Sequence, residues 1–431
     1  MNRFFYYIIL IFYNIVIGLV FLLLLPFKFF YFIKYFKKIY DLKRKKNIWI
    51  HCSSVGEANI VINILQNINN IDCYSFVITV VTKNGKKVLV NFFKNYSNVL
   101  VLNLFFDFYF ISKLFVYLIN PLFVIWVESD FWLNYLQILK NKKIKTILIN
   151  ARISNSSYLR WKKIKFLLKE VLNVFSSIYP SSNGNLIKYK EFYNDNLECI
   201  GNLKYVFREK LDIKLESINL KLQNIKQNDF IIFGLSTHFG EEVILLENFL
   251  KLKEIYSNLK LIILPRHIDR CDNLVLDLKK IYKNIHLVDL MQPFNVINLG
   301  DVLIVKNIGI VSYLCKISNI VYVGRSLSVK KRGGQNIVEP MGLGKFVIVG
   351  KNMENFLDIV DEIMLEKNLG FVMLNHKNEL FDVIKGYYLL DDLKKNHYKI
   401  NNINYIKNKQ FILDKYLSII ESIMLENGKT C

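Results

Sequence analysis

The chain of 431 residues is 52% hydrophobic and carries a formal net charge of +22 at pH 7. It is long enough to bury two ordinary cores, and its high apolar content also predicts a contact with a membrane. The positive charge favours anionic partners, but the chain lacks an aromatic and basic motif of the nucleic-acid-binding kind, so no nucleic-acid partner is expected.

An apolar segment covers residues 4–27 and is interrupted only by Asn14 and Gly18. As a helix it is long enough to cross about 30 Å of hydrocarbon. Bulky aromatic residues follow it, in contrast to the small residues at the cleavage site of a signal peptide. Lysines and one arginine crowd residues 34–46, and the positive-inside rule then places the rest of the chain in the cytoplasm. We therefore expect residues 1–33 to be an uncleaved anchor that either spans the membrane or lies in one leaflet.

Short apolar segments alternate with helical patterns through residues 34–210, which predicts a first domain with a parallel sheet wrapped by helices. The expected strands are residues 48–52, 74–82, 99–102, 122–127 and 146–149. After the first strand, Gly56 is expected to let the backbone turn into a helix. Glu57 would then start a helix at the carboxyl end of a strand, where open α/β sheets place their ligands. A carboxylate there is also a common helix cap, so Glu57 alone is compatible with both roles.

Polar motifs follow the later strands as well. The first domain contains Glu-Ser-Asp-Phe-Trp-Leu-Asn at 128–134, Asn-Ala-Arg-Ile-Ser at 150–154 and Gly-Asn-Leu-Lys at 201–204. Residues 211–228, rich in Lys, Asn and Gln, are the predicted linker.

A second series of strands and helices predicts another Rossmann-like domain at residues 229–400, followed by a C-terminal helix at 401–431. The expected strands are residues 230–235, 259–264, 302–305, 320–323 and 346–349. Polar motifs stand at 236–242 (Ser-Thr-His-Phe-Gly-Glu-Glu), 264–267 (Leu-Pro-Arg-His) and 333–340 (Gly-Gly-Gln-Asn-Ile-Val-Glu-Pro).

In this order and at these separations, the motifs resemble those of the 3-deoxy-D-manno-octulosonic acid (Kdo) transferases of lipid A assembly, over roughly residues 47–375. The resemblance implies an α/β GT-B fold with two Rossmann-like domains facing a cleft. It implies an inverting glycosyltransferase that moves Kdo from CMP-Kdo to lipid IVA at the cytoplasmic face of the inner membrane. Two alternatives remain: a GT-B transferase with another donor or acceptor, and a decayed, non-catalytic glycolipid-binding protein.

The resemblance assigns Glu57 as the catalytic base that removes the acceptor proton. The residues expected to support it or to contact the acceptor are Ser54, Gly56, Glu128, Asp130, Arg152 and Lys204. Glu128 and Asp130 are the second choice as base, with a capping role as the alternative. Residues 140–169 hold ten Lys or Arg and no Asp or Glu, which favours an anionic lipid acceptor and an anionic membrane surface.

The donor-binding residues expected in the second domain are Ser236, Thr237, His238, Arg266, His267, Gly324, Arg325, Ser326, Asn336 and Glu339. Ser236, Thr237 and His238 would hold the phosphate at a strand end, and Glu339 would accept hydrogen bonds from the ribose hydroxyls. No Asp-x-Asp stands at a strand end of this domain, and the six cysteines show no metal-ligand spacing, so neither a metal nor a cofactor is expected. The cysteine pattern also indicates a reducing compartment.

Three positions depart from the family pattern. Arg325 replaces a glycine, Gln335 replaces the histidine of Gly-Gly-His-Asn, and residues 306–310, Lys-Asn-Ile-Gly-Ile, replace Asp-Thr-x-Gly-Glu. Arg325 would either strengthen phosphate binding or fill the donor pocket, and the sequence leaves both open.

Overall fold

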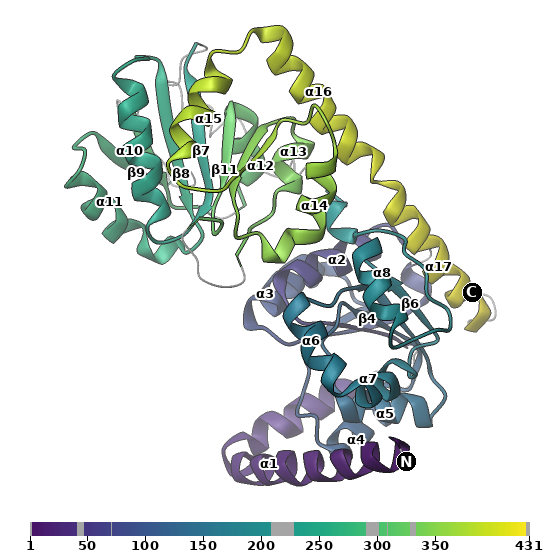
Figure 1. Ribbon diagram of the computed structural model, residues 1–431. Coiled ribbons are helices and arrows are strands. Elements are labelled where there is room, and N and C mark those ends of the chain that lie inside the picture. The colour runs from purple at the N-terminus through teal and green to yellow at the C-terminus, as the bar shows by residue number, and fades with distance from the viewer. Residues whose placement is uncertain are drawn as a thin grey trace. The chain divides into compact units, whose positions relative to one another are not determined.

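The computed structural model describes residues 2–40, 47–69, 71–207, 228–289, 301–307, 309–327 and 333–427. The chain divides into two compact units: residues 1–206 together with 411–431 form unit 1, and residues 207–410 form unit 2 (Figure 1). The predicted linker at 211–228 lies, except for its last residue, outside the described residues.

Unit 1 contains a six-stranded, entirely parallel sheet in the order β3-β2-β1-β4-β5-β6. The strands are β1 (Asn47–Cys52), β2 (Ser75–Val80), β3 (Val99–Asn103), β4 (Pro121–Val127), β5 (Lys145–Ala151) and β6 (Ser177–Pro180). Every residue of β1 and β2 is buried, as expected for central strands that are covered by helices on both faces. The strand order reverses between β1 and β4, which makes their carboxyl ends the switch point where such sheets bind ligands.

The helices of unit 1 are α1 (Asn2–Tyr40), α2 (Val55–Leu65), α3 (Lys83–Phe92), α4 (Tyr109–Ile119), α5 (Leu133–Asn141), α6 (Asn155–Lys163), α7 (Lys165–Leu172), α8 (Asn183–Lys190) and α17 (Phe411–Asn427). Short 3₁₀ turns occupy Ile71–Cys73, Phe93–Asn95 and Leu203–Tyr205. Within α1, residues 4–24 are long and apolar enough to cross a membrane, with a mean hydropathy of 2.7.

Unit 2 contains a seven-stranded parallel sheet in the order β13-β12-β11-β7-β8-β10-β9. Its strands are β7 (Phe230–Thr237), β8 (Leu259–Pro265), β9 (Ile285–Val288), β10 (Val302–Val305), β11 (Ile320–Val323), β12 (Phe346–Gly350) and β13 (Phe371–Leu374). Its helices are α10 (Glu241–Lys253), α11 (Cys271–Lys279), α12 (Val311–Ile317), α13 (Val338–Gly342), α14 (Leu357–Leu365), α15 (Glu379–Tyr388) and α16 (Asp392–Asn408), with 3₁₀ turns at Ile268–Arg270 and Glu354–Phe356. The two parallel sheets confirm the predicted pair of Rossmann-like domains.

The ends of the chain differ from the predicted boundaries. α1 continues past residue 33 to Tyr40, and six of its side chains are buried in the same core as β1 and β4. The predicted helix at 401–431 is split between α16 and α17, and α17 belongs to unit 1. Tyr416 of α17 is fully buried, and its hydroxyl contacts the Asn150 backbone N–H at 3.3 Å. Helical periodicity predicted the helix but could not say on which sheet it packs.

The cysteines differ in part from the predicted reduced state. Cys52, Cys199, Cys271 and Cys315 are free thiols, whereas Cys73 is disulfide-bonded. A reducing compartment predicts free thiols throughout, so Cys73 is the exception among the five cysteines that the structure describes.

Candidate active site

Glu57 lies in the first turn of α2, directly beyond the carboxyl end of β1, and is only 6% exposed. Ser54 caps the helix, since its Oγ accepts a hydrogen bond from the Glu57 backbone N–H at 3.4 Å. The Glu57 carboxylate in turn accepts hydrogen bonds from the Ser53 backbone N–H at 2.6 Å and from Ser54 Oγ at 2.8 Å. This reciprocal pattern is close to a capping box, so Glu57 has the structural role that its position predicts and is held at the sheet edge by it.

Glu128 lies beyond the carboxyl end of β4, the strand next to β1, and its backbone has a φ of 59°. Its carboxylate forms an ion pair with Lys204 Nζ at 2.7 Å. Asn150, which also has a positive φ, donates from Nδ2 to Glu128 at 3.5 Å and accepts from the Leu203 backbone N–H at 2.9 Å. The polar motifs after β1, β4 and β5 and the Gly-Asn-Leu-Lys motif therefore converge on one edge of the sheet, where Lys204, expected to contact an acid group of a substrate, pairs with Glu128.

The surroundings of Glu57 and Glu128 shift the pKa values of the two carboxyl groups in opposite directions. Burial, reinforced by the nearby negative charge of Glu128, raises the pKa of Glu57 from 4.5 to about 8. Burial also opposes ionisation of Glu128, but the Lys204 ammonium outweighs it and holds the pKa of Glu128 below its usual value. A pair of carboxyl groups whose pKa values are pushed apart is the arrangement that separates a proton-transferring group from a permanently charged one.

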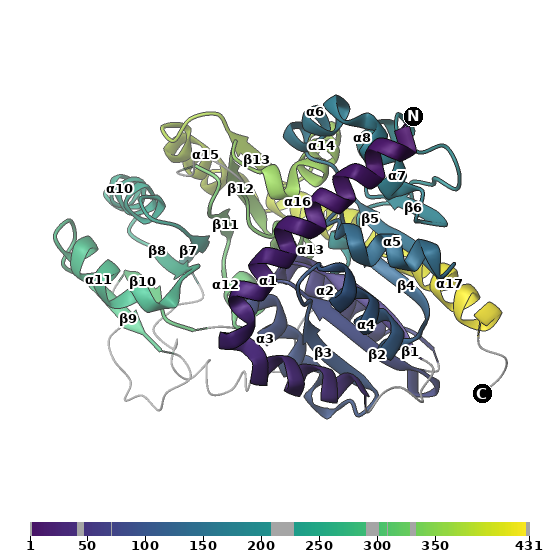
Figure 2. The same cartoon turned by 90° about the horizontal axis from the view of Figure 1, so that it is seen from below.

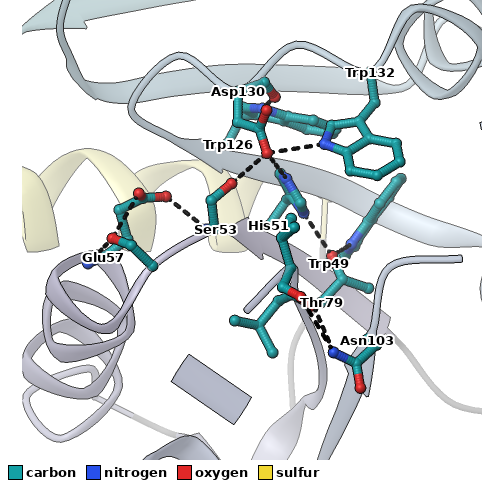
Figure 3. A network of polar contacts seen from close by, with 12 residues as sticks. Trp49, His51, Ser53, Glu57, Thr79, Asn103, Trp126, Asp130 and Trp132 are labelled. Atoms are coloured by element: carbon teal, nitrogen blue, oxygen red, sulfur yellow. Dashed lines mark hydrogen bonds and ion pairs between the residues drawn. The ribbon is translucent and has the colours of Figure 1, made fainter. Parts of the chain in front are cut away.

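Asp130 is the centre of a second polar network beside Glu57 (Figure 3). Its Oδ2 accepts hydrogen bonds from Ser53 Oγ and from Trp132 Nε1, the latter at 3.0 Å. Burial opposes ionisation of Asp130, but the neighbouring His51 ring and these donors outweigh it and lower the pKa of Asp130 to about 2. Because Ser53 bonds Asp130 through its side chain and Glu57 through its backbone, the network connects the two carboxylates.

His51 is fully buried in β1 behind Asp130, and the sequence did not single it out. The Trp49 indole N–H can only donate, so Thr79 Oγ1 accepts from it at 2.8 Å and can give its own proton to His51 Nδ1 at 2.9 Å. The imidazole proton then lies on Nε2, which faces Asp130 Oδ2 at 3.8 Å. Burial lowers the pKa of His51, so the ring is neutral near pH 7. A polar residue in an otherwise apolar buried strand was the signal that could have identified it.

Gly56 and Arg152 adjoin this cluster. Gly56 has no positive φ, so the prediction that the turn needs a glycine there is wrong; the turn is made by Ser54 in an extended conformation. A Cβ at Gly56 would stand 3.8 Å from Lys204 Cε, so the glycine leaves room beside that side chain. Arg152 lies close enough to Glu128 for its charge to lower the pKa of that carboxyl further.

The donor motifs of unit 2 meet at the carboxyl ends of β7 and β11, which are neighbours in its sheet. Gly324 is required for this approach, because a Cβ there would lie 2.5 Å from the Ser236 carbonyl oxygen. The His238 and His267 rings pack edge to face with centroids 5.7 Å apart. Burial lowers the pKa of His238, and the Arg325 charge adds to this effect. Thr237 Oγ1 and Arg325 Nε are buried and have no hydrogen-bond partner among the described residues.

Glu241, at the start of α10, organises these loops, and the sequence did not assign it a role. Its carboxylate is fully buried and accepts five hydrogen bonds of 2.7–3.0 Å. The donors are the backbone N–H groups of His238, Arg325, Ser326 and Leu327 and the Tyr322 hydroxyl. Ser326, predicted as a donor-site residue, is fully buried, and its hydroxyl bonds the Val323 carbonyl at 2.7 Å. It therefore shapes the loop rather than offering a free hydroxyl.

Glu339 lies in the first turn of α13, and its Oε1 accepts a hydrogen bond from Ser312 Oγ at 2.5 Å. Asn336 precedes it, and its Oδ1 accepts from the Val338 backbone N–H at 3.0 Å. Arg266 is exposed after β8, and its backbone N–H bonds the Thr237 carbonyl at 3.0 Å. These predicted residues therefore stand at strand ends and helix starts of unit 2, and Glu339 and Arg266 are both hydrogen-bonded to the scaffold.

Two residues of the segment 306–310, which departs from the family pattern, have acidic partners of their own. Lys306 Nζ forms an ion pair with Asp272 at 2.6 Å, and Asn307 donates to Asp289 at 2.6 Å. Ile308 lies outside the described residues. Among the residues that the structure describes, no three His, Cys, Asp or Glu side chains are grouped so as to hold a metal ion.

The basic segment at 140–169 is partly neutralised by acidic residues from other elements. Lys140 pairs with Glu170 at 3.3 Å, Lys145 with Glu426 at 2.6 Å and Lys162 with Glu191 at 3.7 Å. Around α6, the exposed cationic residues are Arg160, Lys162, Lys163 and Lys165. A positive surface therefore remains on α6 despite the ion pairs.

Comparisons with known proteins agree with the motif pattern. Residues 31–207 match the family described as 3-Deoxy-D-manno-octulosonic-acid transferase (kdotransferase). A 3-deoxy-D-manno-octulosonic acid transferase of Haemophilus influenzae is 30% identical over 321 residues, 73% of each chain. One of Rickettsia bellii is 29% identical over 86% of this chain and 87% of its own. A bifunctional glycosyltransferase/methyltransferase of Fusobacterium nucleatum is 30% identical over 87% of this chain, which spans only 58% of that protein.

Solved structures show the same fold. A glycosyltransferase from Rickettsia africae aligns over 88% of this chain and 99% of its own, with a TM-score of 0.58 at 17% identity. A UDP-GlcNAc 2-epimerase from Neisseria meningitidis aligns over 88% of this chain and 100% of its own, with a TM-score of 0.59 at 14% identity. At these identities the likeness establishes the architecture alone.

Proposed function

Since the chain belongs to the 3-deoxy-D-manno-octulosonic acid transferase family and is a glycosyltransferase, we propose that it transfers Kdo from CMP-Kdo to lipid IVA, with inversion, at the cytoplasmic membrane face. The observation that carries this proposal is the pair of glutamates at the switch point of unit 1. Glu57 has its pKa raised to about 8, and Glu128 is held ionised beside it by Lys204. A base whose pKa is near the working pH is the most effective at accepting a proton from a sugar hydroxyl.

In the proposed step, the ionised Glu57 takes the proton of an acceptor hydroxyl while the hydroxyl oxygen bonds the anomeric carbon of Kdo. The bond between that carbon and the CMP phosphate oxygen breaks, and its electron pair leaves with CMP. Glu128 and Lys204 do not exchange protons in this step. Burial and the Glu128 charge raise the pKa of Glu57, and the Lys204 charge lowers it. Asp130 holds Ser53, whose backbone N–H fixes one oxygen of Glu57.

Unit 2 supplies the donor site in this proposal. The leaving phosphate gains charge as the bond breaks, so cationic and N–H donors that are held in place favour the reaction. Arg325 and Thr237 each have a buried polar atom without a partner among the described residues, which suits them to an anionic ligand. Glu339, whose Oε1 accepts from Ser312, is assigned to the ribose hydroxyls by the family resemblance. The residues are of types that bind a nucleotide without a metal.

The acceptor is proposed from charge. Lipid IVA carries phosphates and lies in an anionic leaflet, and the exposed cations around α6 belong to the same unit as Glu57. A guanidinium or ammonium group pairs strongly with phosphate oxygens.

One reaction tests the proposal. The full chain in detergent is incubated with CMP-Kdo, lipid IVA and EDTA, and the lipid product is analysed by mass. We expect a mass increase of one or more Kdo units with EDTA present. Binding of CMP without transfer would favour a non-catalytic protein, and transfer from a different nucleotide sugar would overturn the donor assignment.

A further inference from the structure

The N-terminal helix α1 is divided lengthwise into a buried side and an exposed side. Its buried residues recur every three to four positions, as on one face of a helix. Over the first arm they are Tyr6, Leu10, Gly18 and Phe21, with Tyr13, Asn14 and Ile17 partly buried between them. Gly18 permits close packing, because a Cβ there would stand 2.9 Å from the Phe108 ring.

The buried side is held to unit 1 by hydrogen bonds along much of its length. The Tyr6 hydroxyl donates to Gln137 Oε1 at 2.9 Å, and the Tyr35 hydroxyl donates to the Asn103 carbonyl at 2.8 Å. Between them, Asn14 donates from Nδ2 to Asn134 Oδ1 at 2.9 Å.

A buried carboxylate stands at the middle of this contact. Asp107 Oδ2 accepts from the Tyr13 hydroxyl at 2.9 Å and from the Asn134 backbone N–H at 3.2 Å. Asn14 Oδ1 completes the contact by accepting from the Tyr109 backbone N–H at 3.0 Å. These hydrogen bonds fix the direction of α1 relative to the sheet of unit 1. A flexible membrane anchor would not require them.

This docking is incompatible with a helix that stands upright across a bilayer. α1 packs along α4 and α7 (Figures 1 and 2), so turning it upright would carry those helices into the hydrocarbon with it. The Lys140–Glu170 ion pair joins α5 to α7, beside the Tyr6 end of α1. Burying these charges and the Asp107 network in lipid would cost several kcal/mol per charged group.

The opposite side of α1 is a continuous apolar surface. Its exposed residues are Phe4, Phe5, Tyr7, Ile8, Ile11, Phe12, Ile15, Val16, Leu19, Val20, Leu22 and Leu23, each at least 40% exposed. Farther along the helix, Lys34, Lys37 and Lys38 are exposed cations. Aromatic residues, aliphatic residues and lysines in this order match the headgroup and upper acyl region of an anionic leaflet.

We infer that α1 lies in the plane of the membrane, with its exposed face embedded in a single phospholipid leaflet and its buried face bonded to unit 1. The helix is then a rigid part of the catalytic unit rather than a flexible tether. Pro26 interrupts the hydrogen-bond ladder inside α1, and the helix is bent into two arms (Figure 2). The inference does not depend on the Kdo reaction, because both of its tests read membrane geometry.

The first test labels the two ends of α1 from each side of a sealed membrane. Phe5→Cys and Lys38→Cys are made separately in a background that keeps only the buried Cys52, Cys271 and Cys315. An impermeant maleimide should label Lys38→Cys from the side of the catalytic units, whereas Phe5→Cys, which lies on the embedded face, should react at least tenfold more slowly from that side and not at all from the far side. Labelling of Phe5→Cys as fast as Lys38→Cys would show that the face is not embedded in lipid. Labelling of Phe5→Cys from the far side alone would establish a spanning helix and overturn the inference.

The second test identifies what covers the exposed face. Leu19→Glu with Leu23→Glu should lower the fraction of full-length protein that floats with phosphatidylglycerol-containing vesicles at least tenfold. Leu393→Glu on α16, where the native side chain is 85% exposed, should leave it unchanged. If the native protein does not float and instead forms a dimer that the double variant dissociates, the face is covered by a second copy and the leaflet inference is wrong.

Discussion

Replacement of Glu57 by Gln separates the two roles that its geometry allows. The amide is almost isosteric: its oxygen can still accept the Ser53 backbone hydrogen bond and its NH2 group can donate to Ser54 Oγ, but it cannot take a proton. If Glu57 is the base, turnover should fall on the order of 10²-fold or more, as after loss of a positioned base. The assay is Kdo transfer from CMP-Kdo to lipid IVA, followed by mass analysis.

The change in folding stability caused by Glu57→Gln has opposite signs for a catalytic base and for an ordinary helix cap. The unfolded chain releases the Glu57 proton near pH 4.5, whereas the folded protein retains it up to about pH 8. Folding stability from this group is therefore complete below pH 4.5 and is lost as the pH rises through 8. At about 1.36 kcal/mol per pKa unit, the loss is on the order of 5 kcal/mol at most. Glu57→Gln should be the more stable protein at pH 8 and nearly equal to the native protein at pH 4.5.

An ordinary helix cap predicts the opposite result. A charged cap stabilises a helix start by about 0.3 to 1 kcal/mol, so its loss would destabilise the protein at pH 8 and leave transfer nearly unchanged. Glu379→Gln is the matched control. Glu379 also lies in the first turn of a helix and accepts the backbone N–H four residues earlier, from Asn375 at 3.0 Å. Chemical denaturation at pH 4.5 and 8 gives the stabilities, and a Glu57→Gln protein that is active and less stable at pH 8 would refute the base assignment.

Three further predictions follow from the same contacts. In the native protein, kcat/KM should rise with pH with an apparent pKa near 8. Glu128→Gln should move this apparent pKa to a lower value, because the Glu128 charge raises the pKa of Glu57. An unchanged or higher apparent pKa would contradict the electrostatic coupling between the two glutamates. Asp130→Asn should lower kcat at least tenfold with little change in the KM for CMP-Kdo, since it weakens the anchor of Ser53, and steady-state kinetics would refute this if only KM changed. Glu339→Ala should weaken CMP binding about 10- to 100-fold in calorimetry with EDTA, through loss of roughly 1.5 to 3 kcal/mol of ribose hydrogen bonding; an unchanged Kd would remove Glu339 from the donor site.

The central strands could be predicted from the sequence because they are buried on both faces and are therefore continuous apolar runs. β1, β4, β7 and β8 all fall within one or two residues of the predicted ranges. The strands that were missed, β6, β9 and β13, are four residues long and lie at or next to the sheet edges. β10 and β11 are equally short but fully buried, and they were predicted, so length alone is not the cause. The missed strands mix buried and partly buried residues, and their assignment depends on a neighbour that the local sequence does not specify.

The site could be predicted as a set of strand-end motifs but not as a set of contacts. Glu57, Glu128 and Lys204 were identified because each lies in a recognisable motif. His51 was not, because its role depends on Thr79 from the next strand and on Asp130 from another motif. α17 was predicted only as part of a C-terminal helix at 401–431, and its place in unit 1 was not predicted, since helical periodicity carries no information about which sheet the helix packs on.

A comparison of Glu57 with Glu241 shows why a capping motif cannot reveal its own function. Both carboxylates start the helix that follows the first strand of their sheet, at the switch point. Glu241 accepts five hydrogen bonds, so both of its carboxylate oxygens are occupied in holding the loop after β11. Glu57 accepts two and faces the negative charge of Glu128. The same backbone position is therefore a structural anchor where donors are abundant, and in the proposed reaction it is a proton acceptor where donors are few and the neighbour is negatively charged.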